Sequence, residues 1–388
     1  MAFFRSAAPA AAALLAAFCT STFSLRAQAA DIPPRYQVFT PPQTIGAQSS
    51  SGEMNLGFNP VSKRYLAMAF ISGNVYRVTP PEVQVPALPE SCDAQWEEKT
   101  PLATSQVQAL GDPILFTDGT TGRTWVSNFT TGANYSYAYT SDDGENWTNA
   151  GVSPPNGGAD HQTLASGPYP ASSPFKQIAT LNGFPNAVYY CSQALFPNFC
   201  QRSDDGGRSF GPGTPFTDGL ACGGLHGHAR VGPDGDVHVP DKSCGGGQPG
   251  YSVSSDAGLN WKDVPIPGMT TGSEDPSIGI ATDGSLYFCN VNANGHVVVS
   301  VSHDKGSNWS APADLSESLG LKNAVFTNAI AGMPASFIRQ SIIANGLDPD
   351  ALPAPLAFHR PNLPDGVKAW KTVYSGGHSV GLVDDVPS

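Results

Sequence analysis

Charged residues are scarce in this 388-residue chain, and basic ones are the scarcest: 20 Lys and Arg stand against 32 Asp and Glu, and all four types together make up 13%. The formal net charge of −12 argues against a nucleic-acid backbone or an anionic membrane surface as partner, because either would repel an acidic protein. Downstream of the N-terminal region no apolar run is long enough to span a bilayer, so no membrane span is expected. A long amphipathic helical pattern is also missing, which excludes a helical bundle.

Glycine and proline are abundant instead, with 42 and 35 copies. They separate many short apolar segments from one another, a pattern that is typical of short strands joined by turns. The predicted fold class is therefore all-β. The length would allow two domains, but large all-β folds often use this many residues for one.

The first residues have the features of a targeting segment. Arg5 supplies a positive end, residues 7–18 form a short apolar run, and Ala27-Gln28-Ala29 is a small-residue cleavage site. The sequence predicts a bacterial-type signal peptide over residues 1–29 and one domain over residues 30–388. A secreted or periplasmic location follows from this prediction.

Six cysteines follow the predicted signal peptide: Cys92, Cys191, Cys200, Cys222, Cys244 and Cys289. An even number in an exported protein favours disulfides, and the spacings match no zinc pattern. Short loops favour the pairs Cys191–Cys200 and Cys222–Cys244. Cys92 and Cys289 then remain for each other by elimination.

One octet recurs four times, in the form Ser/Thr-x-Asp-x-Gly-x-x-Trp/Phe. The copies are residues 140–147, 203–210, 254–261 and 302–309, with their aspartates at Asp142, Asp205, Asp256 and Asp304. Asp and Ser/Thr side chains can accept hydrogen bonds from the backbone of their own turn, and the glycine permits a positive φ. The terminal aromatic residue can fold under the turn. These aspartates are therefore expected to hold turns.

The octet resembles the Asp-box, or BNR, repeat of the sialidase-like β-propeller superfamily. Successive copies are 63, 51 and 48 residues apart, close to the length of a propeller blade. The resemblance implies a six-bladed β-propeller in which the octets lie on the face opposite the active site. Blade starts are expected near residues 55, 112, 160, 228, 275 and 328, with Asn328–Ala331 opening the sixth. Residues 332–388 are poorly patterned, so either residues 36–40 supply a missing strand or the last blade is incomplete.

In a propeller, the residues just before each innermost strand converge on the central channel. Here those positions are unusually polar. The predicted catalytic residues are Asp112, Asp160, His161, His228, Glu274 and Asp275, and the predicted substrate-binding residues are Gln162, His226, Arg230 and Asn328. Facing carboxylates raise each other's pKa, which makes a general acid and a general base from one residue type. Histidine beside them can move protons.

Two functions from different classes fit this pattern. The first is a glycan-acting hydrolase related to sialidases, with Asp160 and Asp275 as carboxylates and His161 and His228 as helpers. The family's Arg-Ile-Pro stretch is missing, so true sialidase activity is not expected. The second is a non-catalytic propeller that binds a protein or glycan. Clustered acids and histidines, with few aromatic residues, favour the enzyme.

No cofactor is required for either function, and the expected protein is a monomer that acts on a glycan or small molecule. A divalent cation such as Ca²⁺ could bind His226 and His228 together with Asp160 and His161, and with Asp112 or Asp275, although no metal-binding motif is present. No metal ligand is therefore assigned.

Overall fold

The structure is a computed structural model, and all of its described residues lie within residues 41–388. It describes residues 42, 55–68, 74–81, 94–101, 109–130, 136–149, 160–193, 198–217, 221–223, 225–272, 274–315, 324–332, 335–357, 360–369 and 371–373. The predicted signal peptide and the candidate strand at residues 36–40 lie outside these residues.

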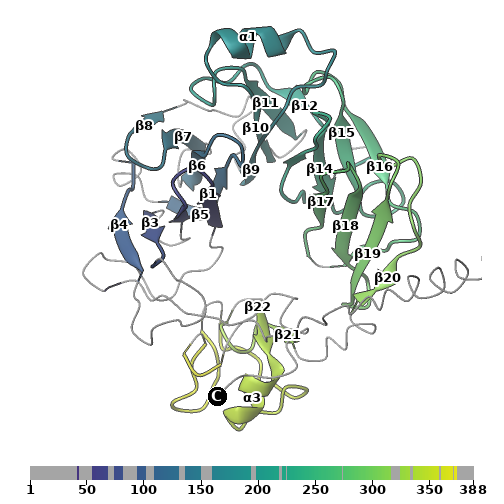
Figure 1. Ribbon diagram of the computed structural model, residues 1–388. Coiled ribbons are helices and arrows are strands. Elements are labelled where there is room, and N and C mark those ends of the chain that lie inside the picture. Colours follow the sequence, from purple (N-terminus) through teal and green to yellow (C-terminus); the bar gives the residue numbers. More distant parts are fainter. Residues whose placement is uncertain are drawn as a thin grey trace, which may run out of the picture. The chain divides into compact units, whose positions relative to one another are not determined.

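The described chain is all-β, as predicted, and consists mainly of four-stranded antiparallel sheets (Figure 1). Each sheet takes its strands in sequence order. The first is β1(Asn55–Asn59), β2(Arg64–Met68), β3(Val75–Thr79), β4(Gln95–Glu98), and the second is β5(Ala109–Thr117), β6(Arg123–Thr130), β7(Ser136–Asp142), β8(Trp147–Asn149). The third is β9(Asp160–Gly167), β10(Ala187–Gln193), β11(Phe199–Ser203), β12(Thr214–Pro215), and the fourth is β13(Arg230–Val231), β14(Val237–Asp241), β15(Gly250–Ser254), β16(Lys262–Pro265). The fifth is β17(Ser277–Ile280), β18(Leu286–Val291), β19(Val297–Ser302), β20(Ala313–Asp314), and β21(Ala324–Thr327) with β22(Ala335–Ile338) forms a hairpin.

Consecutive sheets contact one another through their first strands: β1 with β5, β5 with β9, β9 with β13, and β13 with β17. Glycine allows two of these approaches. A Cβ on Gly57 would collide with Thr117 and Leu115, and one on Gly167 would collide with Val231. Sequential four-stranded sheets that meet through their first strands are what consecutive propeller blades require. The number of six blades stays a prediction.

An apolar layer lies between each pair of neighbouring sheets. Leu66 and Met68 of the first sheet pack with Leu115 and Val126 of the second. The layers between the later sheets are built in the same way, with large residues such as Trp125 and Phe288 fully buried. Each such side chain contributes roughly 1.5–3 kcal/mol by leaving water, so the inter-sheet layers are the main stabilising element.

Three of the four octets form the expected turn. In residues 203–210, the amide of Gly207 donates to Ser203 Oγ at 2.8 Å. The amide of Ser209 donates to Asp205 Oδ1 at 2.9 Å, and the Ser209 hydroxyl donates to Asp205 Oδ2 at 2.6 Å. The same bonds recur at Asp256 and Asp304. At Asp304 the hydrogen bonds from Asn308 hold the carboxyl pKa below its usual value.

The first octet differs, because Asp142 lies opposite Arg123 in the β6–β7 ladder. Its carboxylate pairs with the Arg123 guanidinium at 3.0 Å and does not accept the turn hydrogen bonds of the other copies. The next residue, Asp143, has φ of +57° and turns its carboxylate toward the first sheet.

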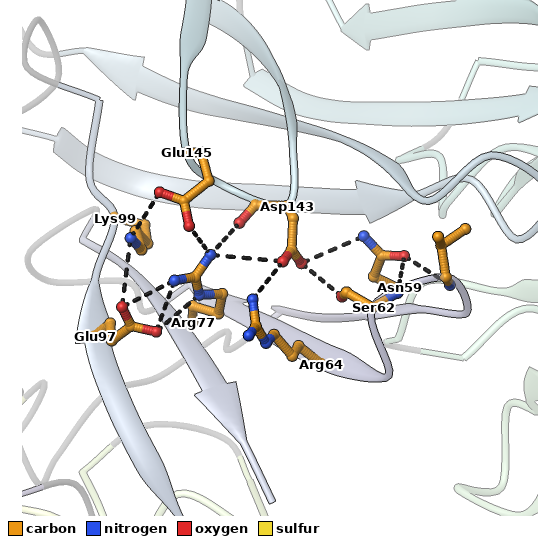
Figure 2. Close-up of polar contacts among 9 residues, drawn as sticks. Asn59, Ser62, Arg64, Arg77, Glu97, Lys99, Asp143 and Glu145 are labelled. Carbon is orange, nitrogen blue, oxygen red and sulfur yellow. Dashed lines mark hydrogen bonds and ion pairs between the residues drawn. The ribbon is translucent and has the colours of Figure 1, made fainter.

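Figure 2 shows how this turn is fixed to the first sheet by a cluster of ion pairs around Arg77. The Arg77 guanidinium is 5% exposed and bonds Glu97 through two nitrogens, at 2.9 and 2.8 Å. It also contacts Asp143 and Glu145 of the turn, and Arg64 reaches Asp143 Oδ2 at 3.1 Å. The hydrogen bond from Arg77 lowers the pKa of Glu97. The cluster joins the first two sheets on the octet side.

The predicted sixth blade start is wrong. Residues 328–332 form the turn between β21 and β22, closed by a hydrogen bond of 2.8 Å from the Gly332 amide to the Asn328 carbonyl. The short apolar run of Ala329, Ile330 and Ala331 resembles a strand in sequence. Its side chains are buried in a separate core with Phe337 and Ile342, whereas Asn328 is exposed.

Two short helices, α1(Phe175–Leu181) and α3(Arg339–Ala344), accompany the sheets. No helix among the described residues is long and apolar enough to cross a membrane.

Both short-range disulfides are confirmed, Cys191–Cys200 and Cys222–Cys244. Cys289 carries a free thiol, so the bond expected by elimination is not formed in this structure, and Cys92 lies outside the described residues. Two disulfides indicate an extracellular or otherwise oxidising location.

Candidate functional site

The first strands of all five four-stranded sheets begin around one cavity of about 390 Å³. This size falls within the range of small-molecule pockets. The lining residues are Asn55, Pro113, Ile114, His161, Gln162, His226, Gly227, His228, Asp275, Pro276 and Ser277. Residues up to 222 positions apart in sequence therefore meet at this place, as the predicted geometry requires.

His161 and Asp275 form an ion-pairing contact between two titratable side chains that line the cavity. His161 Nδ1 lies 3.5 Å from Asp275 Oδ2, and the two side chains are 26% and 36% exposed. His161 belongs to β9 of the third sheet, and Asp275 lies just before β17 of the fifth sheet. The pair therefore joins two sheets between which the fourth sheet stands in chain order. His161 has φ of +48°, an unfavourable conformation for a residue with a Cβ. Such strain often accompanies a functional position.

The segment His226-Gly227-His228 forms the wall contributed by the fourth sheet. His226 is 2% exposed, its Nδ1 lies 2.9 Å from the Gly227 carbonyl oxygen, and its ring contacts the His161 ring edge-to-face at 6.1 Å. A Cβ on Gly227 would collide with the carbonyl oxygen of Pro276. Glycine at this position therefore lets the two histidines approach Asp275.

His228 is solvent-exposed within the concave wall but has protein on most sides. The pKa of His228 is lowered to about 4, mainly by this desolvation and to a smaller extent by the nearby Arg230 and His161. Desolvation also lowers the pKa of Arg230. At neutral pH, the His228 imidazole is neutral and can accept or donate one hydrogen bond.

No group of three or more metal-ligating side chains occurs among the described residues. The side chains of Asp112 and Asp160 are not among those that the structure describes. A divalent cation at this cavity therefore stays an untested hypothesis.

The structure brings five of the ten predicted site residues into the cavity wall: His161, Gln162, His226, His228 and Asp275. Arg230 and Glu274 adjoin this wall in sequence. For Asp112 and Asp160 only the backbone is described: Asp112 lies within β5 directly before Pro113, and Asp160 begins β9 directly before His161. Asn328 lies in the β21–β22 turn instead, and it is not a lining residue.

Sequence reasoning missed Gly227 and Ser277 as parts of the site. Both had a usable signal: Gly227 separates the two histidines, and Ser277 lies two positions after Asp275. Alternate residues of an extended segment share a side, so Ser277 could have been inferred from Asp275.

A second cavity of about 340 Å³ lies beside the octets of the third and fourth sheets. Its charged side chains already have partners within the fold. Arg202 bonds Asp204 at 2.9 Å, and Asp205 accepts the turn hydrogen bonds from Ser209. The cavity at the strand starts is therefore the stronger candidate site.

No family model and no curated protein matches this chain. Among solved structures it is similar to a protein of unknown function from Dyadobacter fermentans DSM 18053, with 15% identity, TM-score 0.36, and coverage of 52% of this chain and 68% of that one. It is also similar to the Hadza microbial sialidase Hz136, with 14% identity, TM-score 0.38, and coverage of 68% and 58%. A third is the GH74 xyloglucanase from Xanthomonas campestris, with 15% identity, TM-score 0.42, and coverage of 71% and 39%. The chain thus spans less than two thirds of the sialidase and of the xyloglucanase, and such low identities transfer no residue roles.

Proposed function

We propose that the cavity at the strand starts is the active site of a secreted, glycan-acting hydrolase of the Asp-box propeller type, with six blades. The observation that carries the proposal is the His161–Asp275 pair at 3.5 Å inside a cavity of substrate size. Polar residues at the first strands of the first, third, fourth and fifth sheets line the same cavity as the pair. Convergent titratable side chains in a concave site are the usual mark of a catalytic centre.

Two carboxyl groups carry the chemistry of glycoside hydrolysis. Asp275 is the first, and Asp160 is the second because its backbone begins β9 directly before His161. One acts as general acid on the leaving oxygen, and the other acts as nucleophile or as general base on water. His161 and His228 assist by donating or accepting protons.

A neutral sugar suits the cavity better than a sialic acid does. Three arginines recognise the carboxylate in the sialidase-like family that the octets resemble, but no arginine is among the residues that line this cavity. Arg230 adjoins the wall but points its guanidinium to the Ala229 carbonyl at 2.9 Å. Amide groups of Asn55 and Gln162 offer the uncharged hydrogen-bonding partners that sugar hydroxyls need.

A non-catalytic glycan-binding site is the second candidate. Pro113, Ile114 and Pro276 give the cavity an apolar wall, and Asp275 is the single carboxylate among the lining residues whose side chains are described. A site that binds a sugar without cleaving it needs such a wall and amides, but no second carboxylate.

Turnover of a panel of chromogenic glycosides by the exported protein distinguishes the two candidates. Amide variants of Asp112, Asp160, Glu274 and Asp275 are compared one at a time with Asp365→Asn, which changes an exposed aspartate far along the chain. Hydrolysis lost in Asp275→Asn and kept in Asp365→Asn supports the enzyme. Unchanged turnover in all four amide variants would refute it, and glycan binding without turnover would support the second candidate. A chelator arm tests the divalent cation.

A further inference from the structure

Ser277 is a hydroxyl group that glycoside hydrolysis does not use. It begins β17, is exposed, and lines the same cavity as His161 and Asp275. Residues 275 and 277 are two positions apart, so in an extended segment their side chains lie on one side and their Cα atoms are about 6.6 Å apart. An imidazole placed between a carboxylate and a hydroxyl can span this separation.

The orientation of His161 is the second observation. Its Nδ1 is the nitrogen that faces Asp275, which leaves Nε2 on the other side of the ring. In hydrolytic triads the carboxylate faces Nδ1, and Nε2 serves as the base for the nucleophile. The histidine–carboxylate pair of such a triad is therefore present as His161 and Asp275, and the Ser277 hydroxyl lies in the wall of the same cavity.

We propose that Ser277, His161 and Asp275 act as nucleophile, base and orienting carboxylate, and that the cavity hydrolyses carboxylic esters, such as acyl groups on glycan hydroxyls. This inference rests on the proposed function only in placing catalysis in this cavity. The bond that is hydrolysed here is an ester on a glycan, whereas the proposed function concerns the glycosidic bond.

The reaction needs only the ester and water. Ser277 Oγ attacks the ester carbonyl carbon while His161 Nε2 takes its proton, and the resulting tetrahedral adduct collapses when His161 returns that proton to the departing alkoxide. The alcohol leaves, and the acyl group stays on Ser277. Water, deprotonated by His161, then attacks the acyl carbon, and the carboxylic acid departs as Ser277 regains its proton.

The negative oxygen of the tetrahedral adduct needs a hydrogen-bond donor in the cavity. His228 offers one from the same wall, because its low pKa keeps the imidazole neutral at working pH and leaves one N–H to donate.

A hydrogen-bonded serine–histidine pair elsewhere in the chain provides a contrast. Ser285 Oγ lies 2.8 Å from His303 Nδ1, but Ser285 is 3% exposed. A carbonyl carbon cannot approach a buried hydroxyl, and the wrong ring nitrogen faces it. Ser285 is therefore the matched control for Ser277.

Labelling with a fluorophosphonate probe tests the inference, since such probes react with activated serines. The full-length exported protein is labelled, and peptide mapping identifies the modified residue without any variant. We expect one label on Ser277, lost in Ser277→Ala, retained in Ser285→Ala and slowed at least tenfold in Asp275→Asn. Hydrolysis of p-nitrophenyl acetate should likewise be lost in Ser277→Ala, retained in Ser285→Ala and slowed at least tenfold in Asp275→Asn.

Absence of label, a label on another residue, or ester turnover unchanged in Ser277→Ala would overturn the inference. Glycoside turnover of Ser277→Ala is measured alongside. If it is retained while ester turnover is lost, both proposals stand. If glycosides are never cleaved but Ser277 is labelled, the glycosidase proposal alone fails.

Discussion

Acidification should destabilise this protein through one buried histidine, His238. This residue lies in β14 with 4% exposure, and its ring packs against Tyr251 at 5.4 Å between centroids. Its Nδ1 has no hydrogen-bond partner among the described residues. Burial lowers the pKa of His238 to about 4, and the opposing effect of the Asp234 carboxylate does not offset it.

The direction in which stability changes with pH follows from proton uptake by the folded and unfolded states. Below pH 6.5 the unfolded chain protonates this imidazole, whereas the folded protein resists protonation until about pH 4. The unfolded state therefore binds more protons in this window, and stability falls as pH decreases through it. Between pH 7 and pH 4.5 the loss from His238 amounts to about 2 kcal/mol, and it levels off below pH 4.

Urea unfolding of the wild type and of His238→Phe at pH 7 and pH 4.5 measures this contribution. The wild type should lose about 2 kcal/mol more than the variant between the two pH values, since all other titrating groups are shared. Val239→Ala, a buried change in the same strand without a titrating group, should lose as much as the wild type. Equal pH losses in the wild type and His238→Phe would refute the reasoning.

Three further changes test the fold around the site. Asp118→Ala should lower the free energy of unfolding in urea by about 3 kcal/mol. The reason is that the buried carboxylate, 2% exposed, accepts hydrogen bonds from backbone amides of its own turn and from side chains of the third sheet. A loss under 1 kcal/mol would contradict this. Arg77→Met should cost about 2 kcal/mol by removing the central cation of the cluster in Figure 2, and unchanged stability would show that the cluster contributes nothing. Gly227→Ala should lower turnover at least tenfold by pushing His226 and His228 away from Pro276, and wild-type kinetics would disprove this close approach.

Much of the sheet structure could be predicted from the sequence because its signals are local. The octet turns depend on hydrogen bonds within eight residues, as at Ser203 and Asp205. The strands are short apolar segments separated by turn residues such as glycine and proline, and this pattern can be read from the sequence. The convergence of the strand starts followed from the propeller architecture rather than from any single motif.

The failures arise where distant contacts decide the outcome. Asp142 carries the octet pattern, yet its cross-strand partner Arg123 takes its carboxylate. The Asn328–Ala331 run resembles a strand, but burial in a separate core makes it a turn. The approach of His161 to Asp275 joins residues 114 positions apart, and no local pattern predicts that distance.

The histidine imidazole signals of the protein in nuclear magnetic resonance test the central claim most directly. Three histidines line the cavity, His161, His226 and His228, whereas His238, His296 and His303 lie elsewhere. During titration with an oligosaccharide that the glycoside panel identifies, signals of the three lining histidines should shift and the other three should stay. Shifts confined to His238, His296 or His303, or saturating binding without any shift among the lining histidines, would contradict the account.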